Sequence, residues 1–128
     1  MALGALDAVI EMKRRDTVLV GGIGAFPEAL DSVAGGGLAM TAGGFAFAGA
    51  WCMVMIHDYD SGHDFAAAGG PRQTNSTVVA AGDAASAARL RDLTDHPSRI
   101  GFRRFSLAEN PRLKAYDFSY SALLAAVR

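Results

Sequence analysis

The stretch TVLVGGI, residues 17–23, decides the fold that we expect. It is rich in β-branched residues and almost wholly apolar, which is typical of a strand covered on both faces. Gly21, Gly22 and Gly24 then allow the chain to turn, and Pro27 suits the first turn of a helix. A buried strand that leads through a glycine-rich turn into a helix indicates an α/β fold.

The same alternation continues through the first 60 residues. Helices are predicted over 2–13, from the helical spacing of its leucines, and from Pro27 to the glycine run 35–37. The second helix carries Leu30 and Val33 inward. A short buried strand over 38–43 and a third helix over 45–60 follow. Short connections between alternating elements imply parallel strands joined by right-handed crossovers, so the sequence predicts a doubly wound parallel sheet.

The second half of the chain is less regular. Residues 61–76, SGHDFAAAGGPRQTNS, have the composition of a loop. We expect a short strand over 76–80, a helix over 83–93 and a C-terminal helix over 119–127.

Composition excludes several classes of protein. Hydrophobic residues make up 51% of the chain and charged residues 20%, which indicates a globular protein. Twelve basic and thirteen acidic residues give a net charge of −1, so no basic surface predicts a nucleic-acid partner. Cys52 is the only cysteine, which rules out an internal disulfide.

The first 16 residues lack the order of a secretory signal, and the longest apolar run, 46–56, is well short of the ~20 residues that span a bilayer.

The segment HDYDSGHDF, residues 57–65, is dense in possible metal ligands. A metal site requires imidazole nitrogens and carboxylate oxygens that converge on one point. On a helix, His57 and Asp60 share a face, whereas Asp58 points about 100° away. Gly62 suits a helix end in the left-handed conformation. We therefore interpret the segment as a polar helix end and predict no metal and no cofactor.

A ligand of an open α/β sheet lies at the carboxyl ends of the strands. Here these ends are residues 22–26 and 43–47, and neither turn carries a nucleophile, a general acid or a general base. Binding without catalysis is therefore the favoured interpretation. The alternative is a small nucleotide- or phosphate-binding α/β enzyme domain that uses the glycine turn 21–24, although Pro27 stands where a dinucleotide fingerprint requires its third glycine.

Several segments carry a resemblance to a known family. MALGALDAV is followed by the strand VLVGGI, the helix PEALDSVAGGG, the strand LAMTAGG and the helix AGAWCMVMI. This series closely resembles the C-terminal lobe of periplasmic sugar-binding proteins of the ribose-binding type, the solute receptors of ABC importers. The resemblance covers residues 1–65, and residues 66–128 fit as a C-terminal extension that packs on the lobe.

The resemblance implies a fold and a function. Family members form two doubly wound lobes joined by a hinge, close on a sugar, and deliver it to a membrane permease. The implied parent is therefore periplasmic and not an enzyme, and this chain would be a fragment that lacks the other lobe. The same fold also serves the effector-binding cores of lactose-repressor-like transcription regulators, which is a second alternative.

The resemblance also implies which residues bind. They are Gly22 and Gly24 after the first strand, and Gly44 and Phe45 after the second. The family usually presents Asp or Asn at the position of Gly24 and a polar side chain near Gly44 and Phe45, and both are missing here. We therefore expect weak sugar binding, with Phe45 as a stacking surface. The missing lobe leaves apolar surface exposed, so a homo-oligomer is also expected.

Overall fold

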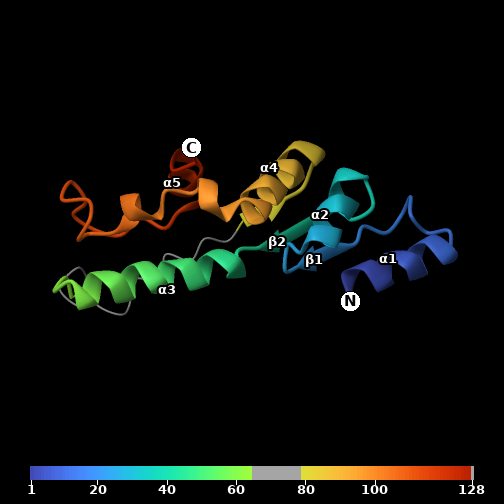
Figure 1. Cartoon of the computed structure of the whole chain (residues 1–128). Coiled ribbons are helices and arrows are strands. Elements are labelled where there is room, and N and C mark those ends of the chain that lie inside the picture. The colour runs from blue at the N-terminus through green and yellow to red at the C-terminus, as the bar shows by residue number, and fades with distance from the viewer. Residues whose placement is uncertain (65–78, 128) are drawn as a thin grey trace. The chain divides into compact units, whose positions relative to one another are not determined.

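The structure is a computed structural model that describes residues 1–64 and 79–127. These residues divide into two compact units, the first made of residues 1–44 and 79–95 and the second of residues 45–64 and 96–127. Figure 1 shows the elements of both in chain order. The chain leaves the first unit between Gly44 and Phe45, and again between Asp95 and His96.

The first unit combines three helices with a small sheet. Its elements are α1 (Ala2–Glu11), β1 (Gly21–Ile23), α2 (Pro27–Ala34), β2 (Met40–Gly43), β3 (Val79–Ala81) and α4 (Ala84–Asp95). The strand order is β1-β2-β3, with Gly22 opposite Thr41 in a parallel pair. The pairing of β2 with β3 is antiparallel, with Ala42 opposite Ala80. The predicted α/β class is confirmed, but the sheet is mixed and not wholly parallel.

The helix α2 forms where local signals place it. Pro27 occupies its first turn, where the fixed φ suits a helix and no N–H group is needed, and Glu28 lies beside the positive end of the helix dipole. The helix ends at Gly35, and the following Gly36 has a φ of +71°. Leu30 and Val33 are buried, which confirms the predicted inward face.

The strand predicted over 17–23 is shorter and more exposed than expected. Only Gly21–Ile23 is extended and paired, and the N–H groups of Thr17 and Val18 instead donate to the Arg14 carbonyl in a turn. Leu19 is 86% exposed and Ile23 is 83% exposed, so the prediction of burial on both faces is wrong for this strand. The reason is that β1 is an edge strand, paired in the described chain with β2 alone.

The second unit is built on the long helix α3 (Phe45–Asp60), whose predicted range is confirmed. The short 3-10 helices η1 (Pro97–Arg99) and η2 (Phe102–Phe105) and the helix α5 (Tyr120–Ala125) complete it. The Trp51 ring stacks on Phe118 with centroids 4.7 Å apart and meets Phe105 edge-on at the same distance. This aromatic cluster is the core of the unit, because Trp51, Phe105 and Phe118 are all buried.

Two expectations concern features that the structure does not describe. The predicted loop lies mostly outside the described residues, as does the start of the predicted strand 76–80. The division into residues 1–65 and 66–128 concerns the relation to a family, and it stays a prediction.

In the part of the chain that the structure describes, no helix has the length and apolar character to cross a membrane.

Candidate functional site

The two strands that were predicted to present a ligand both end at a glycine with positive φ. Gly24 follows β1 with a φ of +133°, and Gly44 follows β2 with a φ of +140°. Side chains with a Cβ rarely adopt this conformation, which explains glycine at both positions. A Cβ at Gly24 would also lie 2.6 Å from Cε2 of Phe26. The Asp or Asn that the family usually carries at this position would therefore be strained in this chain.

The backbone of the first turn is bonded to the sheet. The Gly24 N–H donates to the Ala42 carbonyl at 2.6 Å, and the Ala25 N–H donates to Oγ1 of Thr41 at 3.3 Å. Thr41 is 1% exposed, so its hydroxyl is a fixed internal acceptor. Phosphate binding by a glycine turn needs free N–H groups that point at the anion. Two such groups are occupied here, which weakens the phosphate-binding alternative.

A hollow of about 660 Å³ lies beside β1 in the first unit. It is mostly apolar and is lined by Met1, Ala2, Leu3 and Ala5 of the α1 region, Val20–Ile23, Phe26, Glu28 and Ala29 of the α2 region, and Thr41. Of the residues predicted to bind a ligand, Gly22 lines this hollow. A Cβ added at Gly22 would lie 3.0 Å from Cβ of Ala2, so Ala2 would have to shift to admit a side chain there.

Phe45, the fourth predicted ligand-binding residue, is the first residue of α3. Its side chain is 69% exposed, so the ring offers free surface for stacking. Gly22, Gly24 and Gly44 belong to the first unit and Phe45 to the second. The assignment of these residues to ligand binding stays a prediction.

Sequence reasoning did not single out Phe26 and Thr41. The Phe26 ring is 65% exposed and covers the place where a side chain at position 24 would lie. Thr41 fixes the turn through its bond to Ala25. The one available signal was the position of Thr41 inside an apolar strand, where a polar side chain requires a hydrogen-bond partner.

The segment 57–65 contains a buried carboxylate that also went unrecognised. Asp58 is fully buried and accepts hydrogen bonds from the Ser106 hydroxyl, from the Leu107 N–H at 2.7 Å and from the Tyr116 hydroxyl at 3.0 Å. The Ala108 N–H donates to it at 3.3 Å. Asp58 therefore joins α3 to the segment 106–116.

These bonds set the protonation state of both side chains. Burial by itself raises the pKa of Asp58, but the hydrogen bonds from Ser106, Leu107, Tyr116 and Ala108 outweigh it and hold the pKa below its ordinary value. Burial, together with the bond to the Asp58 carboxylate, raises the pKa of Tyr116 to about 12. At neutral pH the Asp58 carboxyl group is ionised and the Tyr116 hydroxyl group is protonated, so the hydrogen bond between them holds.

The predicted end of the helix at this segment is confirmed, since Gly62 has a φ of +83°.

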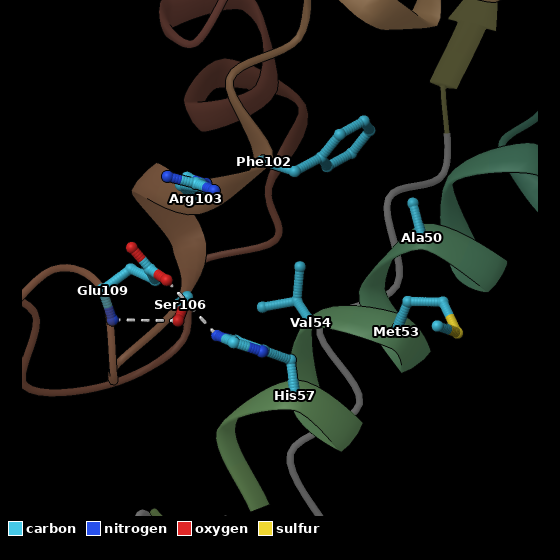
Figure 2. Close-up of a pocket in the computed structure, with 8 residues that line it drawn as sticks. All are labelled: Ala50, Met53, Val54, His57, Phe102, Arg103, Ser106 and Glu109. Carbon is cyan, nitrogen blue, oxygen red and sulfur yellow. Dashed lines mark hydrogen bonds and ion pairs between the residues drawn. The ribbon is translucent and has the colours of Figure 1, made fainter. Parts of the chain in front are cut away.

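His57 lines a second pocket, of about 500 Å³, within the second unit (Figure 2). Its side chain extends from α3 toward Glu109, with Nε2 3.6 Å from the carboxylate. The other lining residues are Ala50, Met53, Val54, Phe102, Arg103 and Ser106. Among residues 1–64 and 79–127, no three His, Cys, Asp or Glu side chains gather as a metal site would require. The prediction that residues 57–64 hold no tightly bound metal stays a prediction.

Comparisons with known proteins place this geometry in context. No protein-family model and no curated protein sequence matches the chain. A solved structure does match it, the crystal structure of a periplasmic sugar-binding protein from Pseudomonas fluorescens, with a TM-score of 0.81 and 33% sequence identity. The match covers 96% of this chain and 38% of the other, so this chain spans well under half the length of that protein. The resemblance inferred from the sequence is thereby confirmed: the chain is similar in sequence and structure to part of a periplasmic sugar-binding protein.

Proposed function

We propose that this chain serves in the binding of a sugar or a similar small polar solute, as part of a periplasmic solute receptor of an ABC importer. The observation that carries the proposal is the similarity to a periplasmic sugar-binding protein at 33% identity over 96% of this chain. Its partners would be the solute and the membrane permease that receives it. The doubly wound lobe is part of the same proposal, and the parallel pairing of β1 with β2 through the crossover helix α2 supports it.

The proposed contacts are Gly22, Gly24, Gly44 and Phe45. Glycines let a ligand approach the backbone closely, and the exposed Phe45 ring suits the apolar face of a sugar. Sugar hydroxyls that lose water on binding need side-chain partners, and each unpaired one costs about 1–3 kcal/mol. Positions 24 and 44 provide no such side chain. The affinity of the chain by itself should therefore be in the millimolar range, about −4 kcal/mol.

The side chains at the carboxyl ends of the two strands favour binding over catalysis. Residues 22–26 and 43–47 contain no side chain that could serve as a nucleophile or exchange a proton at neutral pH. The occupied N–H groups of Gly24 and Ala25 also make this turn a poor phosphate site. A solute that is neutral and hydroxylated fits these properties better than a nucleotide does.

The experiment compares ligand classes by calorimetry. A panel of pentoses and hexoses is titrated into the chain beside inorganic phosphate and AMP. We expect weak heats for at least one sugar and none for phosphate or AMP. Phe45→Ala should abolish the sugar signal, whereas Leu19→Ala, which also removes an exposed apolar side chain, should leave it unchanged. Tighter binding of phosphate or AMP than of every sugar would contradict the proposal.

A further inference from the structure

The helix α3 has two apolar faces. Phe47, Trp51 and Val54 are buried in the core of the second unit. The opposite side of the same helix carries an uncharged set of residues that we call the outer stripe: Phe45, Gly49, Cys52, Ile56 and Tyr59. All of them are exposed, with Phe45 at 69%, Ile56 at 58% and Tyr59 at 61%. A helix that is apolar all round normally has both sides covered.

The spacing of the outer stripe is that of a helix pair. Its residues are separated by four, three, four and three positions, which is the repeat that keeps one seam against a partner helix. The buried residues Phe47 and Val54 lie on the side opposite this seam. Over 16 residues the seam runs for about 24 Å.

We propose that the outer stripe of α3 pairs with the outer stripe of a second copy of this chain, in the antiparallel direction. Two-fold symmetry then places Cys52 close to the axis, facing Cys52 of the second copy. Gly49 lies opposite Ile56 of that copy, so that a small residue receives a large one. Phe45 lies opposite Tyr59, which brings two aromatic rings together at each end. The stripe is therefore complementary to itself, as a two-fold interface requires.

The charges of α3 decide both the direction and the kind of partner. The helix has no Lys or Arg, and its acidic residues lie at the C-terminal end, where Asp60 is exposed. Antiparallel pairing puts Asp60 beside the positive N-terminal end of the partner helix, which stabilises it, whereas parallel pairing brings two Asp60 carboxylates together. A membrane surface would call for basic residues on the flanks of the stripe, and α3 has none.

The expected assembly is reversible, because a single helix face is smaller than the interfaces of most stable dimers. The net charge of −1 offers little repulsion between copies. The pairing does not rest on the proposed sugar site, but the two share Phe45, so the seam would cover the ring proposed to stack on a sugar.

Sedimentation equilibrium across a hundredfold range of concentration tests the pairing. The wild-type chain should change from monomer to dimer with an apparent Kd of roughly micromolar order. Ile56→Lys should raise the apparent Kd at least tenfold. Ile10→Lys is the matched control, because Ile10 is a half-exposed isoleucine on α1, and its Kd should match the wild type. A wild-type monomer at every concentration, or a dimer that Ile56→Lys leaves intact, would overturn the proposal.

Cross-linking with a short bis-maleimide tests the direction. Each thiol adds across one maleimide double bond, so no oxidant is involved. In a Cys52→Ala background, a mixture of Phe45→Cys and Tyr59→Cys chains should give a cross-linked dimer. Phe45→Cys alone should give none, because antiparallel pairing holds the two copies of position 45 at opposite ends. Efficient linking of Phe45→Cys to itself, as strong in the single-variant sample as in the mixture, would mean a parallel pair and overturn the antiparallel proposal.

Discussion

The Tyr116 hydroxyl donates a hydrogen bond of 3.0 Å to the carboxylate of Asp58, and both side chains are buried. The bond joins the last turn of α3 to a segment that lies far away in the sequence. Asp58 was one of the candidates for metal ligation in the sequence. In the structure its oxygen atoms are instead occupied by hydroxyl and backbone N–H donors from residues 106–116.

Asp58→Asn should destabilise the second unit by about 2–4 kcal/mol. In the variant, the side-chain NH2 group of asparagine replaces one carboxylate oxygen of Asp58. A group that now donates to that oxygen would then face another donor, so at least one buried donor would lose its partner. Urea unfolding followed by Trp51 fluorescence measures the change. Asp60→Asn is the control, because Asp60 is exposed at the end of the same helix and should alter stability by less than about 0.5 kcal/mol. Equal stability of the two variants would contradict the structural role of Asp58.

Acid should weaken the protein through the same carboxylate. The pKa of Asp58 is lower in the folded state than in the unfolded chain, so the unfolded state takes up its proton first as the pH falls. The stabilisation is fully present above the ordinary aspartate pKa of about 3.9 and is lost as the pH falls from there through the folded pKa. The difference in unfolding free energy between the wild type and Asp58→Asn should therefore narrow below about pH 4. A constant difference down to pH 2 would show that the pKa is not lowered.

Tyr116 should give a late step when the protein is titrated with base. The chain has three tyrosines, and the pKa of Tyr116 is raised to about 12. Since the folded pKa is above the unfolded one, this stabilisation is present below about pH 10 and is lost as the pH rises toward 12. Absorbance at the phenolate wavelength should show a late step that is missing in Tyr116→Phe. If the late step persists in Tyr116→Phe, its assignment to Tyr116 is wrong.

Local signals in the sequence predicted the helices well. Pro27 and the glycine run predicted the limits of α2, and the apolar run after Gly44 predicted a helix over about 45–60, which matches α3. These features act within a few residues, so the sequence displays them directly.

Features that depend on distant residues were not predictable. The antiparallel direction of β3 and the exposure of Leu19 depend on what lies beside each strand, and the apolar pattern does not encode that. The partners of Asp58 lie at residues 106–116, and no spacing in the sequence connects them to it. The candidate site was predictable as far as the strand ends, because glycine turns after strands are local, whereas the occupied N–H groups of Gly24 and Ala25 were not.

Gly43→Ala should destabilise the first unit. A Cβ at Gly43 would lie 2.6 Å from the Gly24 carbonyl oxygen and 2.7 Å from Cβ of Ala25, so the two strand ends would have to separate. We expect a loss of about 1–3 kcal/mol in thermal or urea unfolding. Gly4→Ala is the matched control, because nothing lies within 4 Å of its Cβ position in α1, and it should stabilise by about 0.5–1 kcal/mol. A Gly43→Ala variant as stable as the wild type would contradict the close approach of the strand ends.

The central claim is that a sugar binds at the carboxyl ends of β1 and β2, and the location of binding tests it most directly. A titration of isotope-labelled chain with the sugar that gives the largest calorimetric signal, followed by two-dimensional amide NMR, reads this location residue by residue. The account predicts fast-exchange shift changes at Gly22, Gly24, Gly44 and Phe45 that saturate at roughly millimolar sugar, with Gly4 and Gly62 unmoved. Shift changes confined to the pocket of His57 and Arg103, or none at any residue up to tens of millimolar, would contradict it.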